Sequence, residues 1–393
     1  MNILKIGFLT AGGIAPCLSS SIACLVNEYK MRAVDVEFIG YLNGYKGLLM
    51  GKTVSIDNID NIDELKKIGG SFLGNSRVKL TNIEDCVSNG YVAKGQIPLE
   101  VAAQQLIKDK IDILHTIGGD DTNTTAGDLI EFLNSKGYDL TVVGLPKTID
   151  NDVFPIKQTL GAFTAADQTS LFFRNIVNEN TTSSRQLIIH EVMGRNCGWL
   201  TAYSAYLYKK DLEKRMFFPE LLVDKEKWDI HAIYIPEVDF DIDEECQRLN
   251  KVMDEYDCVN IFLSEGAGLN SIIDDMKKNN KEINYDAFGH VRLDEINPGQ
   301  WFAKHYKKKL NADKVLVQKS GYFARSASPN DQDLNLISKT AKLAVECALN
   351  DKSCVVGMHE EHDEMTAINF SDIKGGKEFN PNQDWFKEIA SYY

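Results

Sequence analysis

A repeated succession of three local patterns constrains the fold of this 393-residue chain more than any other feature. Each copy is a short apolar run, then a turn rich in Gly, Asp or Thr, then a stretch whose apolar residues recur at steps of three and four. Such alternation of strand-length runs with helices predicts parallel sheets built from βαβ units. In these sheets ligands bind at the carboxyl ends of the strands, where the turns fall. The apolar runs are Ile3–Leu9, Ile111–Ile117, Leu140–Leu145, Leu187–Val192 and Val259–Leu263.

The apolar periodicity also predicts the main helices. Asp331 follows Pro329 and is the expected N-cap of the last of them. The segment Asn82–Pro98 has mixed polarity and is expected to be a surface excursion, and the acidic run Glu237–Glu245 is expected to be a solvated face. The expected helices are Leu18–Met31, Leu99–Asp109, Thr122–Ser135, Phe163–Asn178, Asp243–Tyr256 and Asp331–Leu349.

Length and charge limit the class of protein. At roughly 100–200 residues per domain, the length predicts about two domains. The chain has 43 Lys and Arg against 57 Asp and Glu, a net charge of −14, which argues against nucleic acid and anionic lipid as partners. The apolar runs are too short to span a membrane, and the N-terminus runs into a strand without a signal peptide, so we expect a cytoplasmic protein. The eight cysteines show no zinc or C-x-x-C spacing and are expected to be inert thiols.

Two turns have the composition of a phosphate and metal site. Gly12-Gly13 follows a strand and precedes a helix, so its backbone can approach a phosphate; the alternative is a tight turn that only packs the helix on the sheet. Gly118-Gly119-Asp120-Asp121-Thr122 places two carboxylates at another strand end, which indicates Mg²⁺, with Asp120 the better ligand candidate. Alternatively, both aspartates cap the following helix.

The turn Pro146-Lys147-Thr148-Ile149-Asp150-Asn151-Asp152 is the most informative stretch. It offers a carboxylate to accept a hydroxyl proton and a Lys to stabilise charge on phosphate oxygens, as transfer between a phosphate and an alcohol requires. By position alone, Asp150 or Asp152 could be the base.

Taken together, seven motifs in one order resemble the 6-phosphofructokinase family. Any one of them is weak, but the set extends from residue 6 to about residue 330. The motifs are Gly12-Gly13, Gly70-Ser71-Phe72-Leu73-Gly74-Asn75-Ser76-Arg77, Gly118-Gly119-Asp120-Asp121, Pro146–Asp152, Met193-Gly194-Arg195, Ser264-Glu265-Gly266 and Gly321-Tyr322-Phe323-Ala324-Arg325.

The resemblance implies an α/β fold of two domains, each with a mainly parallel, Rossmann-like sheet flanked by helices, and an active site in the interdomain cleft. Residues 1–160 with a return near 326–365 would form the domain that binds the phosphoryl donor and Mg²⁺. Residues 161–325 with about 366–393 would form the sugar-phosphate domain. The implied reaction is reversible transfer of phosphoryl from the donor to the 1-hydroxyl of fructose 6-phosphate, a step of glycolysis.

The resemblance points to diphosphate as the donor. The chain has Asp121 and Lys147 where ATP-dependent members have glycine. A carboxylate at Asp121 would lie where the α-phosphate of ATP passes, and like charges ~4 Å apart repel by about 4 kcal/mol at an effective dielectric of 20. Lys147 would supply positive charge for the compact diphosphate and stabilise the transition state.

Roles for the remaining residues follow from the same resemblance. Gly12, Gly13 and Arg77 would bind the donor, Asp120 would hold Mg²⁺, and Asp150 would be the proton acceptor. Asp152 would orient its loop or a metal-bound water. The sugar phosphate would be bound by Thr148, Ile149, Asp150, Met193, Gly194, Arg195, Glu265, Tyr322, Phe323, Ala324 and Arg325, with Tyr322 and Arg325 on the 6-phosphate.

The chain departs from the family pattern at two cations. Where relatives have an arginine that reaches a neighbouring subunit, this chain has Gln186, with Arg185 next to it. A further arginine is missing upstream of the last motif, and Lys319 is the nearest cation that could replace it. The family's shared sugar site still implies a homodimer or homotetramer.

Three alternatives remain at the level of the sequence. An ATP-dependent phosphofructokinase is the nearest. A non-catalytic regulatory subunit that binds sugar phosphate would be expected to lack Asp120 or Asp150, and a kinase of dinucleotides would lack the Met193 and Tyr322 motifs; all are present. His359-Glu360-Glu361-His362 resembles a metal motif, but its spacing differs from H-E-x-x-H, and we expect an exposed polar loop.

Overall fold

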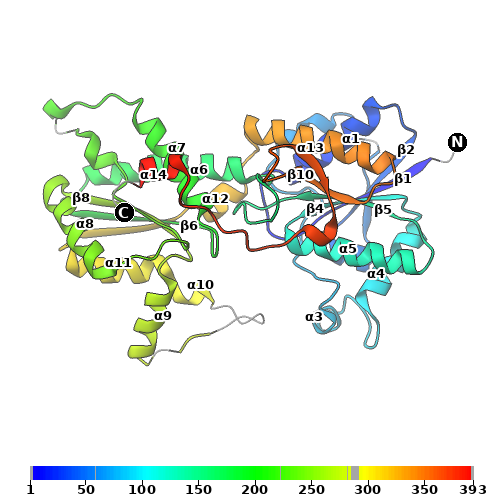
Figure 1. Cartoon of the computed structure of the whole chain (residues 1–393), viewed down its shortest axis with the longest axis horizontal. Coiled ribbons are helices and arrows are strands. Elements are labelled where there is room, and N and C mark those ends of the chain that lie inside the picture. The colour runs from blue at the N-terminus through cyan, green and yellow to red at the C-terminus, as the bar shows by residue number, and fades with distance from the viewer. Residues whose placement is uncertain (1–2, 58, 222, 281, 285–291, 391–393) are drawn as a thin grey trace. The chain divides into compact units, whose positions relative to one another are not determined.

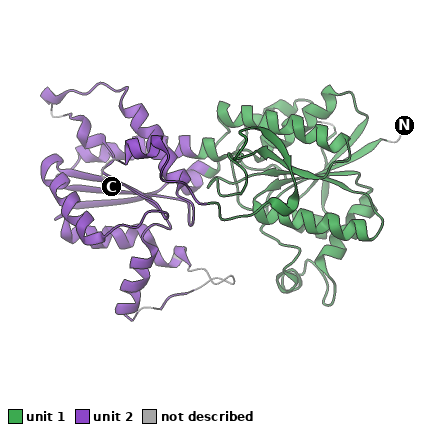
Figure 2. Ribbon diagram, in the orientation of Figure 1, with its two compact units in different colours: residues 1–165, 325–377 green, residues 166–324, 378–393 purple. Residues whose placement is uncertain are grey.

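The computed structural model describes residues 3–57, 59–221, 223–280, 282–284 and 292–390, and the chain separates into two compact units (Figures 1 and 2). Unit 1 comprises residues 1–165 and 325–377, and unit 2 comprises residues 166–324 and 378–393. Each unit has its own sheet and its own core.

Unit 1 contains a seven-stranded sheet in the order β11-β10-β5-β4-β1-β2-β3. The five inner strands are parallel, and the edge strands β3 and β11 are antiparallel to their neighbours. β1, β4 and β5 are almost completely buried because helices cover both faces of the sheet. The strands are β1 (Leu4–Thr10), β2 (Val36–Tyr41), β3 (Thr53–Ser55), β4 (Ile113–Gly118), β5 (Thr141–Pro146), β10 (Cys354–Met358) and β11 (Met365–Ile368).

Helices α1 and α13 lie on one face of this sheet, and α4 and α5 lie on the other (Figure 1). Leu106, Leu114, Leu129 and Val142 belong to the core beneath α4 and α5. The helical segments are α1 (Leu18–Met31), α2 (Tyr45–Leu49), η1 (Ile62–Lys67), α3 (Ile83–Ser88), α4 (Pro98–Asp109), α5 (Asp120–Ser135), α13 (Asp331–Leu349) and η5 (Phe370–Asp372).

Unit 2 contains a four-stranded parallel sheet in the order β7-β8-β6-β9. Helices α7 and α14 lie on one face, and α8 and α11 lie on the other (Figure 1). The strands are β6 (Gln186–Val192), β7 (Ala232–Tyr234), β8 (Cys258–Ser264) and β9 (Lys314–Lys319). The helical segments are α6 (Ala162–Ile176), which begins in unit 1, η2 (Val177–Thr181), α7 (Trp199–Leu212), η3 (Pro219–Leu221), η4 (Lys225–Trp228), α8 (Ile242–Tyr256), α9 (Leu269–Lys278), α10 (Leu293–Ile296), α11 (Pro298–Lys309), α12 (Gly321–Arg325) and α14 (Asp384–Ile389).

The predicted strands and helices are confirmed, with small differences at their ends. Asn330, not Asp331, is the N-cap of α13, because its side chain accepts a hydrogen bond from the Asp333 N–H at 3.0 Å. The segment Asn82–Pro98 is mostly exposed, as predicted for a surface excursion, although it contains α3 and buries Cys86.

The division of the chain differs from the sequence-based boundaries at 161–165, at Arg325 and at 366–377, all of which belong to unit 1. The last difference has a clear cause. β11 pairs with β10, and Lys374 exchanges backbone hydrogen bonds with Phe154, so this stretch extends the unit 1 sheet. The chain crosses to unit 2 only after Lys377.

The prediction that Glu237–Glu245 is a solvated face is wrong at both ends. The Glu237 carboxylate accepts hydrogen bonds from the backbone N–H groups of Gly198 and Phe379, each at 2.8 Å. Glu245 is buried, accepts a hydrogen bond from the Tyr234 hydroxyl, and pairs with Arg248 at 2.7 Å. These carboxylates therefore join segments of unit 2 instead of facing solvent.

All eight cysteines are free thiols and buried, as predicted. Burial raises the pKa of the Cys24 thiol to about 11 and that of Cys258 to about 12. Because the thiolate is the nucleophilic form, these side chains are unreactive near neutral pH.

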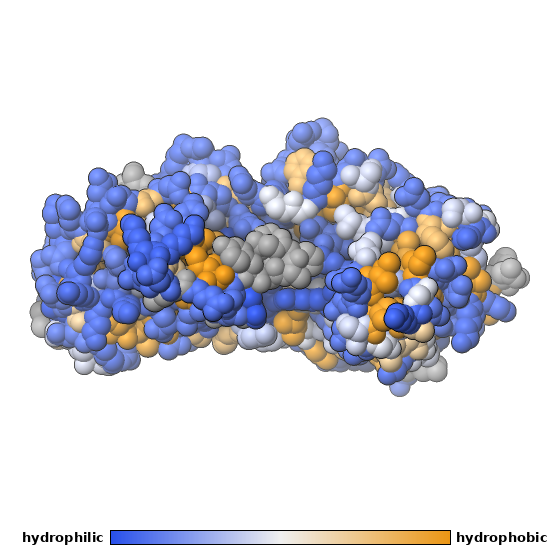
Figure 3. Space-filling model, turned by 90° about the horizontal axis from the view of Figure 1, so that it is seen from below, coloured by the Kyte–Doolittle hydropathy of each residue, from blue (hydrophilic) through white to orange (hydrophobic). Residues whose placement is uncertain are grey.

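The surface is mostly hydrophilic. On the face seen in Figure 3, hydrophilic residues cover most of the area and hydrophobic residues form separate groups. The most exposed apolar side chains include Met216, Leu221 and Met31. Among the described helices, none combines the length and the apolar character that a membrane crossing needs.

Candidate active site

Three polar turns lie at one edge of the unit 1 sheet. β1, β4 and β5 are adjacent and parallel, with Thr10 beside Ile117 and Gly118 beside Pro146 in the register. The turns that follow these strands begin at Ala11, Gly119 and Lys147, so the sheet brings together the three motifs that the sequence singled out. This is the end at which open α/β sheets bind ligands.

Two basic side chains lie against the Gly12–Gly13 turn. The Lys147 ammonium donates a hydrogen bond to the Gly13 carbonyl oxygen at 2.9 Å, and a Cβ at Gly12 would lie 3.1 Å from the same nitrogen. A Cβ at Gly13 would lie 2.7 Å from Nη1 of Arg325. Gly12 has a φ of 84° and donates its N–H to the Ser76 carbonyl at 2.9 Å. Glycine is required here because it admits both the backbone conformation and the cations.

The Lys147 side chain is buried, with 5% of its surface exposed. Its pKa is lowered to about 8, chiefly by burial; the nearby guanidinium groups of Arg325 and Arg77 also act to lower it, while the Cys17 thiol and the Asp150 carboxylate act to raise it. The lowered pKa means that the positively charged form of Lys147 is disfavoured at this buried position. An anion bound at Gly13 would reverse this, so the turn has the electrostatics of an anion site.

Asp120 and Asp121 begin α5 and lie in different environments. Burial raises the pKa of the Asp120 carboxyl, and the charges of Asp121 and Asp152 raise it further. The Asp121 side chain is 60% exposed and pairs with Lys79 at 2.8 Å. A divalent cation would relieve the repulsion between these carboxylates, and their oxygens are the ligands that Mg²⁺ prefers, so the residues fit this ion.

The loop that carries Asp150 is held by its own side chains. The Asp150 N–H donates to Oγ1 of Thr148 at 3.2 Å, and the Thr159 hydroxyl donates to the Thr148 carbonyl at 2.8 Å. The Asn151 side chain accepts from the Thr159 N–H at 2.9 Å and donates to the Lys157 carbonyl at 3.1 Å. These bonds fix the backbone on both sides of Asp150.

A segment that sequence reasoning missed closes against this loop. The Lys377 N–H donates to the Asp152 carbonyl at 3.0 Å, and a Cβ at Gly375 would lie 2.0 Å from Oδ2 of Asp120. The sequence Lys374-Gly375-Gly376-Lys377 contains two adjacent glycines, as two of the other turns of the site do. It does not follow an apolar run, however, so the sequence pattern does not place it at the end of a strand. Its backbone therefore lies directly against the candidate metal ligand.

A second group of predicted residues lies at the carboxyl ends of β6, β8 and β9 in unit 2. The Ser264 hydroxyl donates to the Gly194 carbonyl at 2.6 Å, and the Glu265 N–H donates to the Val192 carbonyl at 2.9 Å. A Cβ at Gly266 would lie 1.7 Å from the Arg195 carbonyl oxygen. The Met193-Gly194-Arg195 and Ser264-Glu265-Gly266 motifs therefore form one compact surface.

The motif that follows β9 is divided between the two units. Tyr322 is 78% exposed, the Phe323 ring lies 5.5 Å from that of Phe172, and Ala324 is buried in unit 2. Arg325 belongs to unit 1 and lies against Gly13. The sequence grouped Arg325 with Tyr322, whereas the structure brings it to the Gly12–Gly13 turn.

The family model described as phosphofructokinase matches residues 5–348. The chain belongs to the phosphofructokinase family. Among curated relatives, pyrophosphate–fructose 6-phosphate 1-phosphotransferase of Methylomonas methanica is 52% identical over 98% of this chain and 95% of its own length. The protein of the same name from Mastigamoeba balamuthi is 51% identical over 99% of this chain and 96% of its own length.

The solved structure of a pyrophosphate-dependent phosphofructokinase from Marinobacter aquaeolei superimposes with a TM-score of 0.72. It is 20% identical in sequence, and the match covers 99% of this chain and 92% of that one. This similarity confirms the predicted phosphofructokinase fold, with its mainly parallel sheets flanked by helices.

Arg185 and Lys319, the two cations next to positions where relatives have arginines, each form an ion pair within unit 2 of this phosphofructokinase. Arg185 precedes β6, at the opposite end from Met193, and its guanidinium contacts Asp254 at 2.8 Å and the carbonyls of Asn311 and Leu310. Lys319 pairs with the buried Glu191 at 2.7 Å. Arg185 is thus part of the unit 2 scaffold, away from the motifs that end β6.

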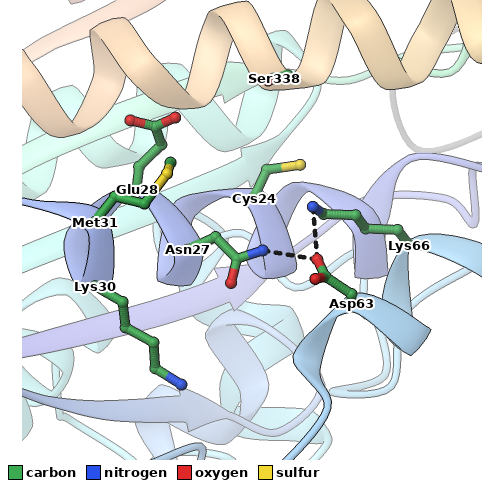
Figure 4. Close-up of a pocket in the computed structure, with 8 residues that line it drawn as sticks. All are labelled: Cys24, Asn27, Glu28, Lys30, Met31, Asp63, Lys66 and Ser338. Carbon is green, nitrogen blue, oxygen red and sulfur yellow. Dashed lines mark hydrogen bonds and ion pairs between the residues drawn. The ribbon is translucent and has the colours of Figure 1, made fainter.

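Two further features of this phosphofructokinase lie outside the predicted residues. A cavity of about 460 Å³ between α1, η1 and α13 contains an ion pair of Lys66 with Asp63 at 2.7 Å (Figure 4). None of the predicted site residues lines it.

Glu361 and His362 are exposed, as expected for this loop, and their candidate ligand atoms lie within 4.8 Å of one another and of His359.

Proposed function

We propose that this phosphofructokinase uses diphosphate as its phosphoryl donor. It transfers a phosphoryl group to the 1-hydroxyl of fructose 6-phosphate and yields fructose 1,6-bisphosphate and phosphate, reversibly and in the cytoplasm. The observation that carries the proposal is the buried Lys147 ammonium at the Gly13 carbonyl, beside Arg325. The shared name of relatives about half identical over nearly the whole chain supports it.

Diphosphate fits the charge of this turn. It is a compact polyanion without a nucleoside, so its affinity must come from the phosphate contacts alone. Lys147 and Arg325 are positive charges close to Gly13, and Arg77 is close enough to Lys147 to lower the pKa of its ammonium. Guanidinium and ammonium groups form the strong, charge-assisted hydrogen bonds that bind phosphate.

Asp121 selects against ATP in this proposal. Its carboxylate is exposed at the start of α5, and Lys79 holds it in place. The ion pair neutralises part of its charge, so the side chain also acts by filling space that a glycine would leave open. Both effects disfavour binding of the longer triphosphate of ATP more than binding of diphosphate.

Each catalytic step has a residue of this chain. The Asp150 carboxylate accepts the proton of the sugar's 1-hydroxyl, and Lys147 stabilises the charge that develops on the transferring phosphoryl group. Asp120 would hold Mg²⁺, with Asp152 orienting the loop behind it, and the ion would neutralise charge on the diphosphate. Gly12 and Gly13 leave room for the cations beside this turn, where the donor would bind.

The sugar phosphate is bound by the unit 2 motifs in this proposal. Met193, Gly194 and Arg195 contact fructose 6-phosphate, Glu265 accepts hydrogen bonds from its hydroxyls, and Tyr322 donates to its 6-phosphate. The active form is a homodimer or homotetramer. Because Arg185 is bound to Asp254 and two carbonyls, it is not one of the residues proposed to reach a neighbouring subunit.

Phosphorus NMR tests the reaction directly. The purified protein is mixed with diphosphate, fructose 6-phosphate and Mg²⁺, and the expected result is equal growth of the phosphate and fructose 1,6-bisphosphate signals. A mixture without sugar controls for hydrolysis of diphosphate. Phosphate release that does not depend on the sugar, or no reaction while ATP supports one, would contradict the proposal.

A further inference from the structure

The turn between β10 and β11 brings three possible metal ligands together. It carries His359, Glu361 and His362, and one ligand atom of each lies within 4.8 Å of the other two. Among the residues that the structure describes, this is the one group of three His, Cys, Asp or Glu side chains found at such a spacing. The two imidazole rings are stacked, with their centroids 4.7 Å apart. Because bonds from Zn²⁺ to nitrogen and oxygen are about 2.0–2.2 Å long, side-chain rotations alone would bring all three groups onto one ion.

Backbone hydrogen bonds fix the shape of this turn. The His359 N–H donates to the Glu364 carbonyl at 2.8 Å, and the Asp363 N–H donates to the His359 carbonyl at 3.0 Å. A helix brings together residues four positions apart, as the H-E-x-x-H motif requires. The closed turn instead brings together side chains two and three positions apart, which explains how ligands can converge here although the spacing differs from that motif.

The turn is also anchored to the neighbouring segment 155–157. The Glu360 N–H donates to the Pro155 carbonyl at 2.9 Å, and the Lys157 N–H donates to the Met358 carbonyl at 2.8 Å. The Lys157 ammonium pairs with the Asp363 carboxylate at 2.8 Å, so this carboxylate already has a partner. Since the backbone is held before any ion binds, binding would have to order only the three side chains, which lowers its entropic cost.

We propose that His359, Glu361 and His362 form a binding site for a divalent transition-metal ion of the Zn²⁺ class. Two imidazole nitrogens and one carboxylate oxygen are a donor set that Zn²⁺ takes in proteins, with a remaining position for water. Mg²⁺ prefers oxygen ligands alone, so this site differs in its metal preference from the carboxylate of Asp120. The inference does not depend on which phosphoryl donor the enzyme uses.

Metal binding would replace one hydrogen bond at the protein surface. The Glu361 N–H donates to Nδ1 of His359 at 3.1 Å. An ion on Nδ1 takes the lone pair that this bond uses, and an ion on Nε2 moves the ring proton to Nδ1. In either case the Glu361 N–H can donate to water instead. His362 and Glu361 are exposed and His359 is partly exposed, so an ion can reach the ligands from solvent.

Calorimetric titration with Zn²⁺ in the presence of saturating Mg²⁺ tests the site. It is run on the parent protein, His362→Gln, Glu361→Gln and the matched control His305→Gln, which removes a partly exposed imidazole on α11. The first two variants should bind Zn²⁺ at least about tenfold more weakly, since even groups that only support a metal ligand contribute about 10–100-fold to affinity. The control should bind within about twofold of the parent.

Thermal unfolding gives a second readout. Zn²⁺ should raise the midpoint of the parent and of His305→Gln, because an ion that binds only the folded protein stabilises it, and should not raise that of His362→Gln. The same measurement without Zn²⁺ shows whether each variant is folded, and if His362→Gln is not, Glu361→Gln decides the question. Equal Zn²⁺ affinity in the parent and the two ligand variants, an equal loss in His305→Gln, or displacement of Zn²⁺ by excess Mg²⁺ would overturn the inference.

Discussion

The ammonium of Lys147 donates a hydrogen bond to the carbonyl oxygen of Gly13 at 2.9 Å, across 134 positions of sequence. The bond joins the turns that follow β1 and β5, two strands that are separated in the sheet by β4. Lys147 is therefore part of the architecture of the Gly12–Gly13 turn as well as a source of charge.

The lowered pKa of Lys147 predicts a pH dependence. Its ordinary value is 10.5, and burial brings it to about 8 in the folded protein. As the pH rises above about 8, the free enzyme loses this positive charge, so kcat/KM for diphosphate should fall. Lys147→Met should lose this alkaline limb and about 10²–10³ in kcat, the usual cost of removing a group that stabilises developing charge.

The same pKa has an opposite effect on stability. Between pH 8 and 10.5 the unfolded chain binds more protons at this lysine than the folded protein, so its contribution to the free energy of unfolding rises with pH. When chemical denaturation is measured at pH 7.5 and 9.5, the free energy of unfolding should rise less between these pH values for Lys147→Met than for the parent protein. An equal gain in both would show that Lys147 titrates normally.

Asp150→Ser should nearly abolish turnover and leave the fold intact. The carboxylate is the proposed proton acceptor, and such groups contribute about 10²–10⁴ to the rate. The loop should keep its shape because Thr148, Asn151 and Thr159 hold it through other atoms. Steady-state kinetics together with the thermal midpoint test this, and activity within tenfold of the parent would remove Asp150 as the base.

Gly375→Ala should raise the Mg²⁺ concentration needed for half-maximal activity. The added methyl group would lie 2.0 Å from Oδ2 of Asp120, so the proposed metal ligand must move. Ser371→Ala, an exposed position earlier in the same segment, is the matched control and should behave as the parent. A Mg²⁺ titration that is unchanged in Gly375→Ala would show that Asp120 is not displaced or does not bind the ion.

Asp333 is predicted to stabilise unit 1. Its buried carboxylate accepts hydrogen bonds from the Gly161 N–H at 3.0 Å, the Thr164 N–H at 2.7 Å and the Thr164 hydroxyl. Asp333→Asn leaves one of these donors unsatisfied and should cost about 1–3 kcal/mol in urea denaturation. The exposed neighbour Asp331→Asn should change stability by less than about 0.5 kcal/mol, and equal effects would refute this role.

The sequence predicts the parts of the fold that have strong local patterns. β1, β4, β5, β6 and β8 are continuous apolar runs because both faces of each strand are buried. The four inner residues of β9 are all partly exposed and lie between exposed terminal lysines, so this strand forms no long apolar run. β11 is a short antiparallel edge strand, which explains why residues 366–377 were assigned to the wrong domain.

The candidate site was predictable where a motif follows a strand. Gly13, Asp120 and Lys147 are examples, since adjacent parallel strands bring their turns together. The approach of Gly375 to Asp120 depends on a return of the chain after more than 250 residues, and the contact between Arg325 and Gly13 depends on where the chain crosses between units. The Gly375-Gly376 pair marks the first of these segments but does not follow an apolar run, and the second contact leaves no local pattern in the sequence.

We propose that Lys147 and Asp121 together make this phosphofructokinase a diphosphate enzyme. The most direct test is the ratio of kcat/KM for diphosphate to that for ATP, measured at the same Mg²⁺ in the parent and in the double variant Asp121→Gly, Lys147→Gly. The ratio is expected to be well above one in the parent and to decrease at least about a hundredfold in the double variant, the size of a lost charge interaction of about 2.7 kcal/mol. A parent that prefers ATP, or a double variant with an unchanged ratio, would contradict it.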